Sequence, residues 1–415
     1  MDTMQKQEPT QEKPSQIVTP WKVTTEGQFN YEILTEQFGL KPITEDLITL
    51  TEKITGHKAN HFLTRNIFYA HQDFDKILEA KAAGKEIYIY TGRGPSAETL
   101  HLGHMLPMMF TAWLQKVLDC YVVIQMSDEE KFYFKEGKLD EFMGYTKSNA
   151  MDIIACGFDP KKTFIFSSFK YEGYTRPLVA EINKKMSVHV TNKIYGFDEK
   201  NNIGQIQWPA YQEAPALCAA FPFLFGNKKD VMCLVPCAVD QAPYFRSIRE
   251  HAVQMGFPKP ALICSKFLVG LGGIGDKASS SSVQAPIFLN DSNDAIKTKI
   301  NKYAFSGGQN TVELHRELGG NIAVDVPYIY LYHFLENEDE LKSIAEAYTS
   351  GKMLSGEIKK RLYDELVKIL DVHRTHRAAI TNQIYNDFFT MKVNSDVAIE
   401  FNDFVQKYLA ITIQY

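Results

Sequence analysis

Residues 87–118 read IYIYTGRGPSAETLHLGHMLPMMFTAWLQKVL, and this stretch decides the fold. Its first residues, Ile87–Tyr90, are β-branched or aromatic and predict a buried strand. The TGRGPS segment that follows is typical of a turn, and Leu100–Leu118 carries apolar residues at helical spacing. A second apolar run, Tyr121–Met126, comes almost at once. Because a strand, a turn, a helix and another strand in this order make one unit of a parallel sheet, the sequence predicts an α/β fold of the Rossmann type.

Short apolar runs predict further strands at Phe164–Phe166, Val231–Val235 and Ala261–Ser265. The second of these is expected to lead through Pro236 into a helix at Asp240–Met255. Beyond a serine run near residue 280 the pattern is helical to the end of the chain. This organisation predicts four regions, namely a disordered polar tail at 1–16, an N-terminal extension at 17–84 that packs on the next region, a parallel-sheet domain at 85–290 with a connecting insertion near 145–230, and a helical domain at 291–415.

The composition limits the partners and the compartment. The 415 residues contain 45 basic and 50 acidic side chains, so the formal charge of −5 does not by itself favour nucleic acid or a membrane surface. The longest apolar stretch, Ala214–Phe225, contains two prolines and is too short to span a bilayer. Six cysteines are scattered in apolar surroundings, which favours reduced thiols in a cytoplasmic protein and no metal site.

The tetrapeptide His101-Leu102-Gly103-His104 lies at the predicted start of the long helix. Unpaired backbone N–H groups and the helix dipole favour a phosphate at such a position. Glycine inside a helix costs about 1 kcal/mol relative to alanine, so we expect a flat group such as a nucleotide base to pack against the bare backbone of Gly103. Taken alone, the tetrapeptide is explained equally well by two structural histidines with a packing glycine.

One glycine-rich segment lies shortly before this helix, and another lies far downstream in the chain. In the upstream turn, Gly92 and Gly94 let a ligand approach the backbone, and Arg93 between them can pair with phosphate oxygens. The downstream segment, GLGGIGDKASSSS at 270–282, predicts a mobile loop whose lysine and hydroxyl groups close over a polyphosphate. A flexible linker is the alternative interpretation of that loop.

These segments together resemble a known family. The pattern His101-x-Gly-His104 and the pattern Lys277-x-Ser-x-Ser281 resemble the HIGH and KMSKS signatures of class I aminoacyl-tRNA synthetases. The stretches VIQMSDEEKF, DIIACGFDP, KTFIFS, VPCAVDQAPYFR and NKYAFSGG are similar to those of tryptophanyl-tRNA synthetases of the eukaryotic cytosolic type. The resemblance runs from about residue 20 to about residue 391. It implies a homodimeric cytoplasmic enzyme with a catalytic domain at 85–290 and an anticodon-binding domain at 291–415.

The resemblance implies a reaction in two steps. Tryptophan and ATP give tryptophanyl-adenylate and pyrophosphate, and the tryptophanyl group then moves to tRNA. The catalytic residues it implies are His101, His104, Lys131 and Lys277, with Mg²⁺ held by the ATP phosphates rather than by protein ligands. The implied ATP-binding residues are Gly92, Arg93, Gly94, His101, Gly103, His104, Asp240, Lys277, Ser279 and Ser281.

The same resemblance assigns the amino-acid pocket. Tyr90 and Gln125 match positions that contact the indole N–H, and a hydroxyl or amide oxygen there would reward a donor that phenylalanine lacks. Glu130, Gln212 and Gln241 match positions that hold the amino and carboxylate groups. For tRNA, the basic positions expected to make contact are Lys297, Lys302, Arg374 and Arg377.

Three alternatives remain open from the residues alone. Tyrosyl-tRNA synthetases share the fold, but a tyrosine pocket is expected to offer a carboxylate to the phenol. Small nucleotidylyltransferases also use His-x-Gly-His, but they generally lack so large a helical C-terminal region. A catalytically decayed, synthetase-like RNA-binding protein is favoured only by the loop, in which Ala278 and Ser280 replace the methionine and second lysine of the signature.

Overall fold

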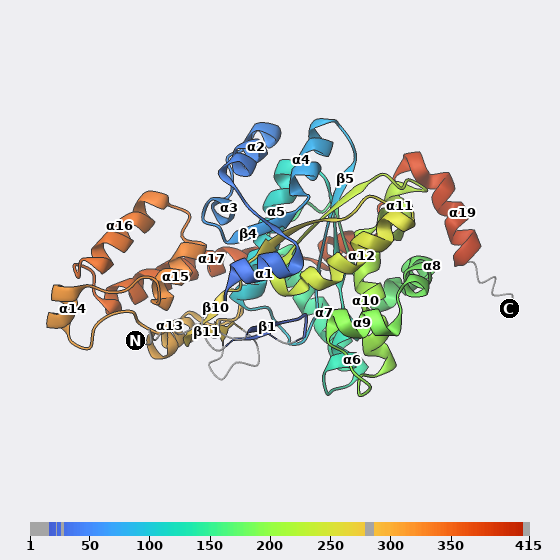
Figure 1. Ribbon diagram of the computed structural model, residues 1–415. Coiled ribbons are helices and arrows are strands. Elements are labelled where there is room, and N and C mark those ends of the chain that lie inside the picture. The colour runs from blue at the N-terminus through green and yellow to red at the C-terminus, as the bar shows by residue number, and fades with distance from the viewer. Residues whose placement is uncertain (1–15, 22, 26–28, 279–285, 410–415) are drawn as a thin grey trace, which may run out of the picture.

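The computed structural model describes residues 16–21, 23–25, 29–278 and 286–409 (Figure 1). The tail predicted at 1–16 therefore lies outside the described residues, except for Gln16. A seven-stranded sheet forms the centre of the molecule, with strand order β3-β4-β9-β8-β5-β6-β7. Its strands are β3 (Lys41–Pro42), β4 (Phe68–Gln72), β5 (Ile87–Arg93), β6 (Tyr121–Met126), β7 (Thr163–Ser167), β8 (Met232–Ala238) and β9 (Ala261–Ser265).

Strands β9, β8, β5, β6 and β7 are parallel, and β3 and β4 add an antiparallel edge. From β5 the chain proceeds to β6 and β7 on one side, whereas β8 and β9 lie on the other side. The strand order therefore reverses between β5 and β8. Ligands of such sheets bind beyond the carboxyl ends of the strands at this kind of reversal. The sheet confirms the predicted α/β fold.

The strand bounds depart from the prediction where glycine and proline were taken as breaks. Strands β6 and β9 have the predicted bounds. Strand β5 continues through the predicted turn, because Gly92 and Arg93 pair with Gln125 and Met126 of β6. Strand β8 also continues, with Pro236 opposite Ile263 of β9. The predicted helix at 240–255 accordingly starts later.

The two faces of the sheet support two separate cores. Ile87 and Ile89 point into one core and Tyr88 and Tyr90 into the other, as alternation along a strand requires. Helices that contribute to the first core are α2 (Glu45–Thr55), α3 (His61–Thr64), α4 (Phe74–Ala82), α5 (Leu102–Leu118) and α7 (Leu139–Ile154). Helices that contribute to the second are α1 (Tyr31–Phe38), α8 (Ser168–Lys185), α9 (Val188–Tyr195), α10 (Ile203–Glu213), α11 (Pro222–Phe225) and α12 (Ala242–Gln254).

The C-terminal helices divide between the two ends of the molecule (Figure 1). One group lies on one side of the sheet and comprises α13 (Asn293–Tyr303), α14 (Val312–Leu318), α15 (Val326–Phe334), α16 (Glu338–Thr349) and α17 (Ser355–Ala378). The last two helices return to the sheet: α18 (Asn382–Phe389) packs against β7, and α19 (Ala398–Tyr408) packs against α11. Residues 291–409 thus form a helical group plus two helices that pack on the part of the molecule built around the sheet. In the described ranges, no helix has the length and apolar character needed to cross a membrane.

The segment predicted as a mobile glycine-rich loop is in part an antiparallel hairpin. Strands β10 (Val269–Gly270) and β11 (Gly273–Lys277) pair with each other, and Gly273 allows the turn because its φ is +101°. A second small hairpin is formed by β1 (Gln16–Val18) and β2 (Val23–Thr25), and β2 packs against β11. The predicted contacts of Ser279 and Ser281 lie outside the described residues.

Candidate active site

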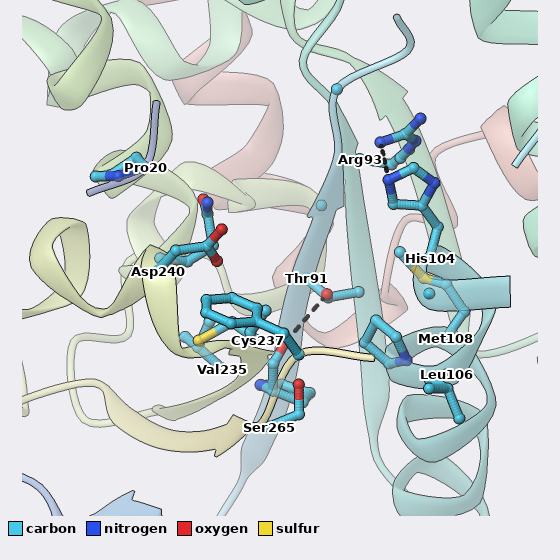
Figure 2. Close-up of a pocket in the computed structure, with 18 of the residues that line it drawn as sticks. Pro20, Thr91, Arg93, His104, Leu106, Met108, Val235, Cys237, Asp240 and Ser265 are labelled. Carbon is cyan, nitrogen blue, oxygen red and sulfur yellow. Dashed lines mark hydrogen bonds between the residues drawn. The ribbon is translucent and has the colours of Figure 1, made fainter. Parts of the chain in front are cut away.

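A cavity of about 290 Å³ lies at the carboxyl ends of β5 and β8, beside the start of α5 (Figure 2). Figure 2 shows Arg93 and His104 together on one side of it and Asp240 on the opposite side. The cavity therefore sits where the strand order reverses. Most of the predicted site residues meet on its wall, namely Tyr90, Gly92, Arg93, Gly94, His101, Gly103, His104, Glu130, Lys131, Gln212, Asp240 and Gln241.

The two histidines at the start of α5 are each held in one tautomer. His101 is the N-cap, and its Nδ1 accepts a hydrogen bond from the Gly103 N–H at 3.1 Å, so the proton of the neutral ring is on Nε2. His104 Nε2 lies 3.0 Å from Nη1 of Arg93. Because a guanidinium only donates, this nitrogen accepts, and the proton of the neutral ring is on Nδ1. Two imidazoles with centroids 3.6 Å apart thus each carry an N–H donor, the group that phosphate oxygens bind.

The side-chain position of Gly103 faces two neighbouring residues. A Cβ at this position would lie 3.1 Å from the ring of His101 and 3.6 Å from the Cβ of Ala278. The imidazole of His101 therefore occupies the space that a side chain at this position would need, and the packing of a nucleotide base against the glycine stays a prediction. Ala278 is buried and brings the end of the β10–β11 hairpin against the start of α5. The two segments that resemble signatures are consequently neighbours.

Arg93, at the end of β5, is held from two sides. Its Nε donates to Oδ1 of Asn149 at 3.2 Å, and its Nη1 donates to His104. Burial lowers the pKa of the Arg93 guanidinium to about 10, against the opposite influence of the Glu130 and Asp152 carboxylates. Its Nη2 has no acceptor among the described residues. A buried guanidinium with one unused donor therefore lines the cavity.

Glu130 and Lys131 form the next part of the wall, at the start of α6 (Asp128–Phe134). Glu130 accepts hydrogen bonds from Ser127 Oγ at 2.8 Å and from Lys131 Nζ at 3.0 Å. Gly94 makes this arrangement feasible, because a Cβ there would lie 2.2 Å from Cε of Lys131 and 2.8 Å from Oε2 of Glu130. The bare backbone of Gly94 thus leaves room for an ion pair on the cavity wall.

A buried acidic pair lies behind Glu130 on the same helix. Asp128 accepts hydrogen bonds from Ser167 Oγ at 2.5 Å and Ser168 Oγ at 3.3 Å, and Ser168 also bonds to Glu129. Burial raises the pKa of Glu129 to about 8, and the neighbouring Asp128 acts in the same direction. Of the three acidic residues in the first turn of this helix, Glu130 is the one that lines the cavity.

Tyr90 and Gln125 belong together, but only one of them lines the cavity. The hydroxyl of Tyr90 lies 2.5 Å from Oε1 of Gln125 and 2.9 Å from the backbone oxygen of Gln212. Gln125 is 1% exposed, and its amide donates to the backbone oxygen of Tyr211 at 3.2 Å. That both side chains contact the indole N–H stays a prediction. Gln125 supports the hydroxyl of Tyr90 from behind.

Several predicted site residues lie away from the cavity wall or outside the described residues. The backbone of Lys277 pairs with Val269 in the hairpin, and nothing is described of its side chain. Lys297 and Lys302 are exposed on α13, away from the cavity wall. Arg374 and Arg377 on α17 bond within the molecule: Arg374 Nη1 to Asn293 at 2.9 Å and Arg377 Nε to Asp152 at 2.6 Å. Those two guanidinium groups are used between elements of the fold.

Sequence reasoning missed two groups of functional side chains. Cys237, Ser265, Lys266 and Phe267 line the cavity from the ends of β8 and β9. Their strands were predicted, but no pattern distinguishes the residues that face a ligand. Asn149 and its neighbours on α7 were also missed. Their signal is a row of polar residues three apart on a buried face of that helix, Thr146, Asn149 and Asp152.

Comparisons with known proteins agree with this geometry. The cytoplasmic tryptophan–tRNA ligase of Oryctolagus cuniculus is 45% identical over 379 residues, which are 90% of this chain and 80% of the rabbit chain. That of Arabidopsis thaliana is 43% identical over 396 residues, 94% of this chain and 98% of the plant chain. The crystal structure of Plasmodium falciparum tryptophanyl-tRNA synthetase matches with a TM-score of 0.82 at 42% identity, covering 87% of this chain and 98% of that one. A family model described as tRNA synthetases class I (W and Y) matches residues 81–371. This chain therefore belongs to the class I tRNA synthetases of the tryptophan and tyrosine type.

Proposed function

We propose that this chain is a tryptophan–tRNA ligase that activates tryptophan with ATP and transfers it to the tRNA for tryptophan. It is an aminoacyl-tRNA ligase by family, and the relatives that match it over nine tenths of its length are ligases for tryptophan. One observation carries the assignment of the site. A single cavity is lined by the histidines and the arginine proposed to bind phosphate and by a buried tyrosine with amide and carboxylate side chains.

The first step joins the tryptophan carboxylate to the α-phosphate of ATP and releases pyrophosphate. His101, His104 and Arg93 offer N–H donors from one side of the cavity to the phosphoryl oxygens, where negative charge develops. Lys131, Lys277, Ser279 and Ser281 are proposed to bind the pyrophosphate end. Mg²⁺ bound to the ATP phosphates would neutralise part of their charge. Asp240, across the cavity, is proposed to bind the ribose.

The amino acid is proposed to lie against Tyr90. The acceptor Oε1 of Gln125 fixes the hydroxyl of Tyr90, which leaves the hydroxyl oxygen to accept from the indole N–H. Glu130 would hold the ammonium group, and Gln212 and Gln241 the remaining polar atoms. A ligand without an indole or similar donor leaves that buried hydroxyl oxygen without its partner, which costs affinity.

The second step and the assembly extend the proposal. The sequence predicts four tRNA contacts, at Lys297, Lys302, Arg374 and Arg377. The two lysines are the better candidates, because they are exposed whereas both arginines bond within the molecule. A cytoplasmic homodimer is proposed from the relatives' location and from the exposed apolar side chains of α9 and α10, with Val188 62% and Ile203 77% exposed. Light scattering of the purified chain measures the dimer directly.

Pyrophosphate exchange into ATP, measured with each amino acid in turn and without tRNA, tests the proposed substrate. Exchange with tryptophan alone supports it. Exchange with tyrosine instead would show that the pocket is assigned to the wrong amino acid. A folded protein that exchanges with no amino acid would favour a decayed synthetase, and would overturn the proposal.

Lys277 can be tested separately because its role is specific to the leaving group. The Lys277→Ala variant should lose exchange by about a hundredfold, as removal of one transition-state donor typically does, while it binds tryptophan as the wild type does. Binding is measured by calorimetry without ATP. Equal losses in exchange and in tryptophan affinity would contradict a leaving-group role.

A further inference from the structure

Asp152 lies on α7 at a point where three parts of the molecule meet. The residue is 1% exposed, and both its carboxylate oxygens and its backbone oxygen accept hydrogen bonds from other elements. It lies three residues after Asn149, which holds Arg93 at the cavity wall. Asp152 itself does not line the cavity.

One carboxylate oxygen of Asp152 fixes the entry to the HIGH-like segment. Oδ2 accepts from Thr99 Oγ1 at 2.9 Å and from the backbone N–H of Leu100 at 3.1 Å. The next residue is His101, the N-cap of α5. The backbone of Leu100 is also fixed at its oxygen, which accepts from Leu289 N at 2.9 Å. The position of the His101 ring therefore depends on the position of the Asp152 carboxylate.

The other carboxylate oxygen is held by the C-terminal helical group. Oδ1 accepts from Nε of Arg377 at 2.6 Å, in the last turn of α17. One turn earlier, Nε2 of His373 lies 2.9 Å from the backbone oxygen of Asp152. Nη2 of Arg377 donates to Ser148 Oγ at 2.9 Å. His373 and Arg377, four residues apart on α17, thus both bind the same turn of α7.

The opposite charges of Asp152 and Arg377 make the contact between α7 and α17 sensitive to substitution. The carboxylate is almost fully buried, and Arg377 supplies the only opposite charge within 4 Å of it in the described part of the chain. Removal of one partner from a buried pair leaves an uncompensated charge, which draws in water or moves the segment. A carboxylate that is already bonded to a guanidinium also orients its second oxygen firmly toward Thr99 and Leu100.

We propose that Asp152 is a positioning residue that ties helix α17 to His101, so that the seating of the C-terminal helical group adjusts the ATP end of the active site. Arg377 then acts through Asp152 and not as a tRNA contact. This inference rests on the proposed function for its readout. It predicts a defect in adenylate formation even when no tRNA is present, from an arginine that does not line the cavity.

The experiment is tryptophan-dependent pyrophosphate exchange without tRNA for four variants of the full chain. Arg377→Gln should lower kcat by about tenfold or more, since a small misplacement of a phosphate-binding group is costly, while the KM for tryptophan changes less than twofold. Asp152→Asn should lower kcat to a similar extent, because the amide oxygen still accepts from the Leu100 N–H but the ion pair with Arg377 is lost. The double variant should be no worse than either single variant, and Arg377→Lys should recover part of the rate.

Arg361→Gln is the matched control. It neutralises an arginine of the same helix whose bonds, to Glu340 at 2.5 Å and Glu365 at 2.8 Å, stay inside the C-terminal group, so exchange should equal that of the wild type. Unchanged exchange in Arg377→Gln would overturn the inference. So would equal losses in Arg377→Gln and Arg361→Gln with parallel losses of thermal stability, which would mark a structural role alone. Absence of tryptophan-dependent exchange in the wild type would instead count against the proposed function.

Discussion

At the scale of single residues, the hydroxyl of Tyr90 shows how a buried polar atom sets specificity. The hydroxyl donates its proton to Oε1 of Gln125 and to the backbone oxygen of Gln212. Its oxygen is then left to accept a hydrogen bond from a ligand. Gln125→Leu removes the stronger of the two acceptors. We expect tryptophan to bind about 1–3 kcal/mol more weakly, measured by calorimetry, with the KM for ATP unchanged. Equal tryptophan affinity in the variant would contradict this role of Gln125.

Glu213 gives the protein a pH dependence that does not involve catalysis. Its side chain is 0% exposed, it accepts from the hydroxyl of Tyr195 at 2.7 Å, and burial raises its pKa to about 8 from 4.5. Between these two values the folded state binds a proton that the unfolded state has released, so stability falls as the pH rises from about 4.5 to about 8.

Glu213→Gln keeps the shape and removes that titration. Urea unfolding at pH 5.5, 6.5 and 7.5 should give a free energy that declines less steeply than that of the wild type, by at most about 1.4 kcal/mol per pH unit. Glu129 titrates in the same range and is present in both proteins, so it does not affect the difference. Parallel pH profiles for the two proteins would show that Glu213 is charged in the folded state.

At the scale of elements, the end of β5 is shaped by the absence of a side chain. Gly94→Ala would place a Cβ 2.2 Å from Cε of Lys131, which is the far end of a flexible chain and can move away. We expect kcat/KM for ATP in the exchange reaction to fall by about tenfold, as a misplaced cation would cause, with an unchanged urea midpoint. Lys131→Met should give a similar loss, and the double variant should add little to it. A lower urea midpoint without loss of exchange would contradict the prediction.

Local patterns predicted those elements whose limits are set by burial alone. Tyr121–Met126 and Ala261–Ser265 are apolar runs buried from both sides of the sheet, and their bounds were predicted correctly. The limits of β5 and β8 were wrong because pairing with neighbouring strands, not local preference, carries the chain through Gly92 and Pro236. The β10–β11 hairpin was missed because its glycines are equally typical of a loop.

The site residues divide in the same way, into those that the sequence predicts and those that depend on tertiary packing. Residues such as His101, His104 and Glu130 were predicted to share a site because they match motif positions of the family that the sequence resembles, and all three line the cavity. The polar row on α7 marks Asp152 as a buried polar residue, but its partners could not be predicted, since Thr99 and Arg377 are 53 and 225 positions away in the chain. The burial of Gln125 behind Tyr90 likewise depends on packing that no spacing reveals.

At the scale of the whole molecule, several contacts fasten the C-terminal helical group to the catalytic half, and two of them centre on buried charged side chains. One is Asp152 with α17. The other is Arg65, whose side chain is 4% exposed and donates to Glu338 at 2.8 Å and to the backbone oxygen of Tyr332 at 2.7 Å. Nearby, Nε2 of His61 lies 2.9 Å from the backbone oxygen of His333. The two contacts lie on different helices of the group, so each can be removed while the other remains.

Arg65→Met should therefore weaken the attachment of the helical group without touching the cavity. The substitution removes the donor from the half-buried backbone oxygen of Tyr332 and from that of the exposed Glu336, and it also removes the Glu338 ion pair; loss of one such hydrogen bond costs about 1 kcal/mol. Calorimetry should show a low-temperature shoulder as α13–α17 unfold ahead of the sheet, while exchange at 25 °C stays at the wild-type rate. Lys360→Met removes an exposed pair, with Lys360 75% exposed, and should leave the thermal profile unchanged. If Arg65→Met unfolds in one transition at the wild-type temperature, Asp152 and the apolar contacts hold the group, and the attachment at Arg65 contributes nothing measurable.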